Sequence, residues 1–227
     1  MSKDEFGYMT ESTFTIPETS LEVTIRNIRI NDIDKILQLQ EVSFPDMAAY
    51  GMVWPASYLE RHIHIFPEGQ LCAEINGEIV ASASSLIVCL KSKYSDHTWH
   101  EVTGYGLFTT HDLRGDTLYG ADISTHPKLQ RKGIGTLLYN VRKNLVIRMN
   151  LRRIVIGGRL INYYKYANKL SAIEYSRKVI EGEIEDPVLS FQLKNGFKFI
   201  KVLPNYIYDR RSMNYSNFLE WLNLQYY

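Results

Sequence analysis

The stretch HPKLQRKGIGTLLY, residues 126–139, decides the fold of this chain. Two glycines follow a basic pair in it, and the sequence then becomes apolar. The preceding residues 117–125 (TLYGADIST) alternate apolar and polar side chains, which predicts a strand. Apolar residues then recur at helical spacing, which predicts a helix over 133–149. A loop between a strand and a helix directs free backbone N–H groups and the positive end of the helix dipole at one point, so the stretch predicts a phosphate site.

Three kinds of phosphate-binding loop compete for this pattern. A P-loop needs Lys-Ser or Lys-Thr after its last glycine, and neither follows Gly135. A dinucleotide-binding loop needs a third glycine at the position of Leu138. The pattern that remains is Gln/Arg-x-x-Gly-x-Gly/Ala, which Gln130, Gly133 and Gly135 satisfy. The two commonest nucleotide-binding loops are therefore excluded.

The rest of the chain predicts a mixed sheet with helices on its faces. Asn76-Gly77 separates two apolar runs and predicts a hairpin, and Asp186-Pro187 with Asn195-Gly196 predicts the two ends of a helix. Strands are predicted over 21–30, 70–77, 78–90, 117–125, 152–158, 197–203 and 216–222, and helices over 31–44, 56–66, 133–149 and 186–195. The remaining segments are predicted as a polar tail or an added outer strand (1–20), a long loop or irregular hairpin (91–115) and a partly helical stretch (160–183). No linker divides residues 21–227, so we expect one domain there.

The composition is ordinary for a globular protein and argues against several classes. The chain has 227 residues and a formal net charge of +1, without the basic excess typical of a nucleic-acid-binding protein. No apolar run is long enough to span a membrane, and we find no signal-peptide core. Cys72 and Cys89 lie in strand-like surroundings without CxxC spacing, which predicts two reduced core thiols in a cytoplasmic protein.

In its context of strand, loop and helix, the glycine pattern resembles the acetyl-CoA-binding motif of the GNAT (Gcn5-related N-acetyltransferase) superfamily. The predicted order of elements is similar to the GNAT order from about residue 21 to 222. The stretches IFPEGQLCAEINGEIVASASSL, GGRLINYYKYA and DPVLSFQLKNGFKFIKVLPNYI look like the GNAT-type domain that precedes a carbon–nitrogen hydrolase (nitrilase-like) domain in some bacterial proteins. The sequence stops at Tyr227, so we expect no hydrolase domain and no amidase chemistry in it.

This resemblance implies a fold and a cofactor. The fold is α/β (α+β): a central, mixed, mostly antiparallel twisted sheet with splayed fourth and fifth strands and helices on both faces, with insertions at about 91–115 and 159–186. The co-substrate is acetyl-CoA, whose pyrophosphate binds the loop and whose pantetheine arm pairs with the edge of the fourth strand. The implied loop residues are Gln130, Arg131, Lys132, Gly133, Ile134, Gly135 and Thr136, and the strand residues are Ile123, Ser124 and Thr125. The competing interpretation is a plain helix start whose glycines allow tight packing.

The resemblance also implies direct transfer of the acetyl group to a primary amine. The amine must lose a proton, the thioester carbonyl needs a hydrogen-bond donor, and the departing thiolate benefits from an acid. In the family a backbone N–H of the fourth strand, here Ile123, commonly serves the carbonyl. A carboxylate on the same strand, here Asp122, is often the base. An equally good interpretation is that Asp122 binds backbone or a basic side chain at the strand end.

The acid is harder to assign. Many GNAT enzymes carry a tyrosine four residues before the Gly-Phe pair that ends the last crossover helix, and this chain has Gln192 there, which cannot act as an acid. Tyr163, Tyr164 and Tyr166, after the fifth strand, are the candidates to replace it, with Tyr119 as a further one, and we favour Tyr163 and Tyr166. For each tyrosine alone, packing is the simpler interpretation. Gln192 also motivates the alternative of a non-catalytic acyl-CoA-binding or regulatory module.

The sequence leaves the acceptor and the assembly open. The acceptor could be a small polyamine, an amino acid derivative, or a protein N-terminus or lysine, and the two insertions should carry the specificity. Two histidine pairs, His62 with His64 and His97 with His100, lack the further ligands of a metal site, so we expect no metal. We expect no nucleic acid and no membrane as partners. GNAT domains are often dimers, so a homodimer is one expected state.

Overall fold

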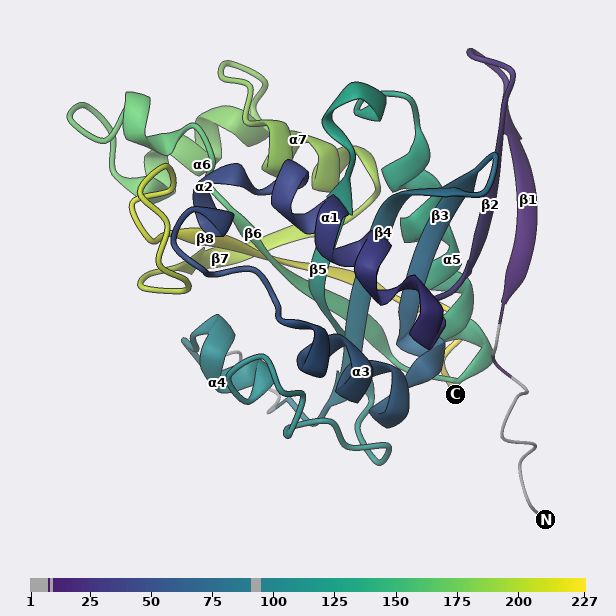
Figure 1. Ribbon diagram of the computed structural model, residues 1–227. Helices are drawn as coiled ribbons and strands as arrows, with labels where there is room; N and C mark the ends of the chain where they lie inside the picture. The colour runs from purple at the N-terminus through teal and green to yellow at the C-terminus, as the bar shows by residue number, and fades with distance from the viewer. Residues whose placement is uncertain (1–7, 9, 91–94) are drawn as a thin grey trace.

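The computed structural model describes residues 8, 10–90 and 95–227, and one eight-stranded sheet lies at its centre (Figure 1). The strands lie across the sheet in the order β1-β2-β3-β4-β5-β6-β8-β7. Their bounds are β1 Glu11–Ile16, β2 Leu21–Asn27, β3 Gln70–Ile75, β4 Glu78–Val88, β5 Thr117–Thr125, β6 Arg153–Arg159, β7 Lys198–Leu203 and β8 Ser216–Leu222. Neighbouring strands pair antiparallel except β5 and β6, which are parallel. The predicted mixed, mostly antiparallel sheet is therefore confirmed.

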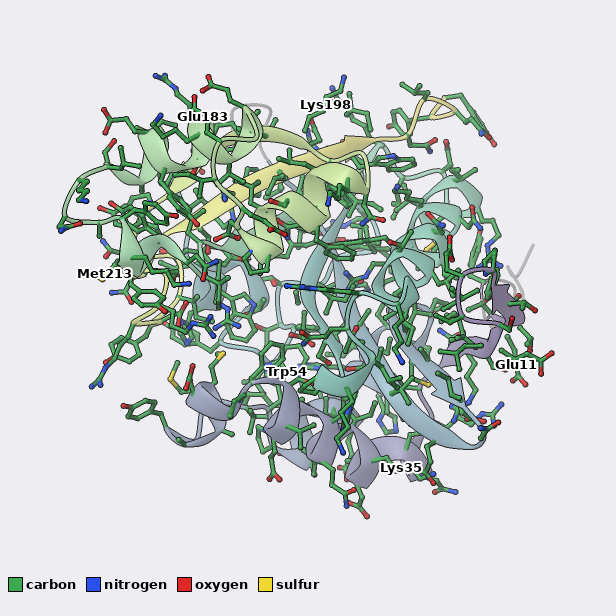
Figure 2. The ribbon with its side chains drawn as sticks, turned by 90° about the horizontal axis from the view of Figure 1, so that it is seen from above. Glu11, Lys35, Trp54, Glu183, Lys198 and Met213 are labelled. Atoms are coloured by element: carbon green, nitrogen blue, oxygen red, sulfur yellow. The ribbon has the colours of Figure 1, made fainter. Side chains whose placement is uncertain are left out.

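Helices cover both faces of this sheet. The α-helices of the described residues are α1 Ile33–Ser43, α2 Pro45–Ala48, α3 Ala56–Ile65, α4 Trp99–Thr103, α5 Ile134–Arg148, α6 Ala172–Ile180 and α7 Pro187–Lys194. Successive strand residues point to opposite faces, so Tyr119 and Val155 pack in the core under α1 and α3, whereas Leu118 and Ile154 pack in the core under α5, α6 and α7. Viewed from above, Lys35 of α1 and Trp54 lie on one side of the sheet and Glu183, beyond α6, lies on the other (Figure 2).

The parallel strands β5 and β6 separate after a short paired segment. Residues 117–120 of β5 pair with residues 153–156 of β6, whereas residues 121–125 and 157–159 have no partner across this gap. β5 and β6 are the fourth and fifth strands when the count starts at β2, so the predicted splay is present. The sheet thus offers an open strand edge at the carboxyl end of β5.

A bulge in β5 lies where the gap begins. Ser84 of β4 pairs with Asp122 and Ser85 pairs with Gly120, so Ala121 is the extra residue of the bulge. Gly120 is required at this point, because a Cβ there would lie 2.8 Å from the Ile156 side chain. The bulge and the glycine therefore shape the exact place where the two strands part.

Two segments and the two cysteines answer open or mistaken expectations. Of the N-terminal residues, 11–16 form the outer strand β1, which pairs with β2, while 1–7 and 9 lie outside the described residues. The segment 91–115, predicted as a loop or irregular hairpin, contains α4, and its residues 91–94 lie outside the described part. Cys72 is buried as predicted, but the core position predicted for Cys89 is wrong, since it follows the last residue of β4 and is exposed.

Candidate active site between strands β5 and β6

The loop before α5 presents a row of free backbone donors. Gly133, the residue that caps α5, has a φ of 84°, and Arg131 has a φ of 63°, so the chain turns sharply before the helix. Leu137 donates to the carbonyl of Gly133, and this is the first backbone bond of the helix. Across the fully described residues 131–136, no backbone N–H donates to another group of the protein. These N–H groups and the helix dipole form a site suited to an anion.

The two glycines of the motif have different roles. A Cβ on Gly133 would meet only the Ile16 side chain at 3.7 Å, so the positive φ is what favours glycine there. A Cβ on Gly135 would lie 2.8 Å from the Phe191 ring of α7, so this glycine is needed for helix packing. The packing interpretation is thus correct for Gly135 and does not exclude an anion at its N–H. The Ile134 side chain is buried, so only its backbone can serve a ligand.

The predicted strand residues follow the open edge of β5. The Ser124 hydroxyl lies 2.9 Å from the Ser82 hydroxyl, which fixes it within the sheet. The Thr125 carbonyl accepts from the Gln130 side chain at 3.3 Å, so Gln130 ties the loop back to the strand. Ile123 packs its side chain against the cores under α5. What these residues offer toward the gap is their backbone.

The Asp122 carboxyl group lies on the face of the sheet that carries α1. Asp122 pairs with Ser84, which stands two residues from Leu86 of the core under α1, and side chains two apart on a strand share a face. Burial raises the pKa of Asp122 to about 6, and Arg142, Arg159 and the N–H of Ile123 act against that rise. A carboxyl group with this pKa can exchange a proton near neutral pH.

Arg142 of α5 is a buried cation beneath the bulge. Its Nη2 donates to the carbonyl of Ser84 at 2.7 Å and to the carbonyl of Asp122 at 2.5 Å, and its Nε has no partner. Arg142 stands four residues after Leu138 and three before Leu145, so it shares the inner side of α5 with them, and it is almost completely buried. Helical spacing indicates which side of α5 Arg142 occupies, but it cannot indicate the acceptors, which lie on β4 and β5.

Gln192 of α7 lies against the open edge of β6. A Cβ on Gly158 would collide with the Gln192 side-chain amide, so the glycine makes room for it. Gln192 is buried, and its Oε1 has no hydrogen-bond partner. A hydrogen bond from Gln192 lowers the pKa of Tyr139 on α5, although burial raises that pKa more. A buried side-chain carbonyl oxygen is therefore available beside the gap, at the position where many GNAT enzymes carry a tyrosine.

Tyr206, between β7 and β8, is a site residue that the sequence did not single out. Its ring and hydroxyl fill the space that a side chain at Gly157 would take, just past the last paired residue of β6. Its hydroxyl lies 2.6 Å from the Tyr119 hydroxyl on β5. Burial raises the pKa of both phenols. Tyr206 follows Tyr119 by 87 positions, so only the fold brings them together.

The tyrosines proposed as acids pack elsewhere. The Tyr163 hydroxyl donates to the carbonyl of Leu170 at 3.0 Å, and its ring contacts Tyr175 and Tyr215. Tyr166 also contacts the Tyr175 ring, at 5.3 Å between centroids. These recorded contacts are those of packing residues around α6, and an acid role for either tyrosine stays a prediction.

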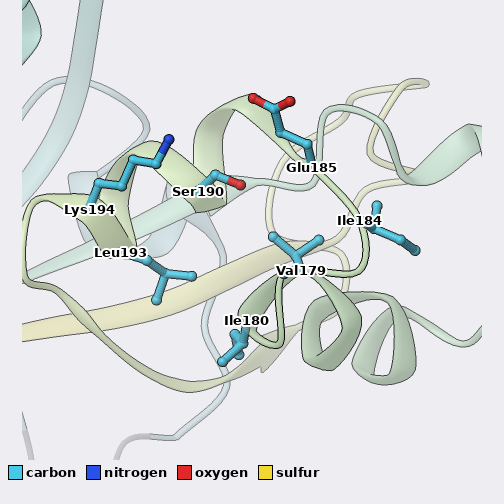
Figure 3. A pocket seen from close by; sticks show the side chains of 8 residues that line it. Val179, Ile180, Ile184, Glu185, Ser190, Leu193 and Lys194 are labelled. Carbon is cyan, nitrogen blue, oxygen red and sulfur yellow. The ribbon is translucent and has the colours of Figure 1, made fainter.

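Metal ligands, membrane helices and surface depressions were the other candidates for a site in the described residues. Over residues 8, 10–90 and 95–227, no group of three His, Cys, Asp or Glu side chains could hold a metal ion. No helix of the described chain has the length and apolarity to cross a membrane. A shallow depression of about 290 Å³ lies between the end of α6 and α7, and its lining residues come from 179–194 alone (Figure 3). It therefore contains nothing from β5 or the loop before α5.

A family model described as "Acetyltransferase (GNAT) family" matches residues 33–167. The chain belongs to the GNAT family. It is 43% identical over 204 residues to the uncharacterized N-acetyltransferase YkwB of Bacillus subtilis (strain 168), with 90% of each chain covered. It is 45% identical over 206 residues to the probable hydrolase YhcX of the same organism, with 90% of this chain and 39% of YhcX covered. The chain thus spans about two fifths of YhcX and nine tenths of YkwB.

Solved structures share the fold of this GNAT protein. The loading GNATL domain of CurA from Lyngbya majuscula has a TM-score of 0.76 at 20% identity, covering 88% of this chain and 97% of that one. The GphF GNAT-like decarboxylase in complex with isobutyryl-CoA has a TM-score of 0.70 at 19% identity, covering 87% and 98%. The putative acetyltransferase yncA of Salmonella typhimurium with acetyl-CoA has a TM-score of 0.50 at 17% identity, covering 88% and 93%. At these identities the likeness concerns the fold.

The residues around the gap fit a CoA co-substrate. The free N–H groups of 131–136 suit a pyrophosphate, and the unpaired edge of β5 suits an extended arm that carries amide groups. The unpartnered Oε1 of Gln192 is an acceptor beside the same gap. The donors and acceptors of a pantetheine chain therefore have complementary groups here.

Proposed function

We propose that this chain transfers an acetyl group from acetyl-CoA directly to a primary amine. One observation carries the proposal. The open edge of β5, residues 121–125, is followed directly along the chain by the loop whose N–H groups, at 131–136, are free. Extended backbone edges bind amide-bearing chains, and helix N-termini bind phosphates. CoA presents both groups in that order, so one molecule would occupy both features.

The chemistry proposed for the gap follows from the groups that line it. CoA supplies an activated acyl group and a good leaving group when it is bound. Asp122, with a pKa raised to about 6, takes the proton of the incoming ammonium group. The N–H of Ile123 favours the Asp122 carboxylate until Asp122 takes that proton, and it then polarises the acyl carbonyl. Positioning the two reactants supplies much of the remaining acceleration.

The acceptor would approach from the face that carries α1. Arg159 of β6 lies there, with its guanidinium 3.6 Å from Asp209 and 5.5 Å from the centre of the Phe44 ring. The insertion at 91–115 also reaches this face, since the Trp99 indole donates to the carbonyl of Ala121 at 3.0 Å. These contacts support the insertions as carriers of acceptor specificity. The homodimer and the cytoplasmic location stay predictions.

A charge placed at residue 136 tests the CoA site. Thr136 is an exposed residue in the first turn of α5, where the helix dipole stabilises a carboxylate, so Thr136→Glu should fold normally. The same carboxylate would repel a pyrophosphate and weaken CoA binding about tenfold in calorimetry. Thr136→Gln, similar in size and uncharged, is the matched control. Equal CoA affinity for the two variants would refute the site. Gly135→Glu is a poorer test, because any side chain there meets Phe191.

Turnover separates the enzyme from the alternative of a non-catalytic acyl-CoA-binding module, which the buried Gln192 favours. Thiol release would be measured from acetyl-CoA and isobutyryl-CoA with spermidine, alaninamide and a lysine-containing peptide. An enzyme releases CoA with at least one amine and loses that activity in Asp122→Ala. Binding of both thioesters without release for any amine would favour the binding module.

A further inference from the structure

We propose that Tyr206, Tyr119 and His97 form a proton relay that connects the gap between β5 and β6 with the surface. The inference rests on the proposed acetyl transfer. The Tyr206 hydroxyl lies over Gly157 at the start of the gap and 2.6 Å from the Tyr119 hydroxyl. The Tyr119 hydroxyl lies 3.3 Å from Nε2 of His97. Tyr206 and Tyr119 are buried, and His97 is partly exposed, so the chain of groups leads outward.

The partners of His97 fix the direction of this relay. Its Nδ1 lies 3.2 Å from the carbonyl of Ser95, which can only accept, so Nδ1 carries the proton of the neutral ring. Nε2 is then an acceptor, and Tyr119 donates to it. Tyr206 in turn donates to Tyr119, which leaves the lone pairs of the Tyr206 oxygen free to accept. With a neutral His97, the relay is therefore set to take a proton from the gap.

The charges around His97 keep the imidazole in the required form. Burial is the largest influence on its pKa and lowers it, and Lys201 of β7 lowers it further. The Ser95 carbonyl, Glu101 and Asp96 act in the opposite direction. Lys201 pairs with Asp96 at 2.7 Å, so the nearest cation and anion partly compensate each other. Tyr119 and Tyr206 are the titratable groups that face the ring from the sheet and from the segment between β7 and β8. The net effect is a pKa of His97 below its ordinary value, which favours the neutral imidazole that the relay needs.

The relay balances the protons of acyl transfer. When the amine nitrogen forms its bond to the acyl carbon, its surplus proton passes to Tyr206, the Tyr206 proton passes to Tyr119, and the Tyr119 proton passes to Nε2 of His97. When the carbon–sulfur bond breaks, the imidazolium returns a proton along the same path to the thiolate. One hydroxyl can serve both atoms, because nitrogen and sulfur are bonded to the same carbon at that stage. Asp122 acts earlier, on the ammonium form of the acceptor, and Gln192 has no proton to give.

The protein without ligand gives the first test. The hydroxyl of Tyr119 donates to the neutral imidazole, so Tyr119→Phe should raise the pKa of His97 by about half a unit to one unit, measured by NMR. His97→Gln assigns the resonance, and His100→Gln, an exposed neighbour outside the relay, is the control. An unchanged His97 pKa in Tyr119→Phe would overturn the hydrogen-bonded chain.

Kinetics give the second test. Tyr206→Phe keeps the ring over Gly157 and should lower kcat about 100-fold with little change in the KM for acetyl-CoA. Tyr175→Phe is the control. It also deletes one buried hydroxyl, but that hydroxyl donates to Asp186 and is not part of the relay, so the variant should keep the parental kcat. Below the pKa values of both Asp122 and His97, the logarithm of kcat/KM for acetyl-CoA should fall with a slope of two, because both groups must be deprotonated. The slope should be one in His97→Gln. A slope of two in that variant, or a kcat of Tyr206→Phe near the parental value, would overturn the relay.

The two tests separate the relay from the function on which it rests. If the unmodified protein releases no thiol with spermidine, alaninamide or the lysine peptide while Tyr119→Phe shifts the His97 pKa, the acetyl transfer is overturned and the hydrogen-bonded chain is supported. If thiol is released and Tyr206→Phe is as fast as the parent, the acetyl transfer is supported and the relay is overturned.

Discussion

Replacing Arg142 by methionine should lower the free energy of unfolding of the protein. The guanidinium is buried, and its two hydrogen bonds go to the carbonyls of Ser84 and Asp122 at 2.7 and 2.5 Å. Charge-assisted bonds of this kind contribute about 1.5–3 kcal/mol each, so about 3–6 kcal/mol is lost. Removing the unpartnered Nε returns about 1–3 kcal/mol, which leaves a net loss of about 2–3 kcal/mol.

Urea unfolding followed by tryptophan fluorescence measures this loss. Arg148→Met is the matched control, because Arg148 lies on the same helix and is exposed, and its replacement should change the free energy of unfolding by no more than about 0.5 kcal/mol. Arg142→Met should also raise the pKa of Asp122 further, since the Arg142 charge now opposes that rise. A loss in Arg142→Met no larger than that in Arg148→Met would refute the idea that the buried cation holds the bulge.

Three further outcomes follow from the same contacts. Folding raises the pKa of Asp122 from its unfolded value of about 4 to about 6, so the ionised carboxylate destabilises the folded protein above about pH 6 and has no such effect below about pH 4. Urea unfolding should therefore show Asp122→Asn to be more stable than the parent at pH 8 and equally stable at pH 4. Gly158→Ala should destabilise the protein by about 1–3 kcal/mol because it displaces Gln192, and Gly158→Ala with Gln192→Ala should recover most of that loss; no recovery would show that the amide is not what fills the space. A thiol reagent should label Cys89 in the folded protein and Cys72 only after unfolding, and equal labelling of both would contradict their burial.

Local patterns predicted the elements that depend on local physics. The alternation in 117–125 predicted β5, and Asn195-Gly196 predicted the end of α7, where Gly196 adopts a φ of 78°. The hairpin at Asn76-Gly77 is confirmed by the pairing of β3 with β4, and Gly77 has a φ of 80°. Each of these features is determined by residues that stand close together in the sequence.

The site depended on contacts that no local pattern contains. Arg142 has the helical spacing of the buried Leu138 and Leu145, but its carbonyl partners become available only when the bulge forms in β5. Tyr206 lies in an irregular segment and meets Tyr119 through the order of strands β6, β8 and β7. The family pattern pointed to the correct loop and strand, and it pointed to Gln192 as the departure. It could not indicate that Tyr206 lies over Gly157, next to the Gly158 of β6 that Gln192 covers.

The short ladder between β5 and β6 has a mechanical consequence. In terms of paired residues, β1–β5 and β6–β8 are two half-sheets joined by four pairs, whereas β4 and β5 alone share eight. A small rotation of one half-sheet against the other changes the width of the gap and leaves the antiparallel pairs intact. A ligand lying along β5 would bridge the two half-sheets. Amide hydrogen exchange at 121–125 and at 157–159 would then slow together when the ligand binds.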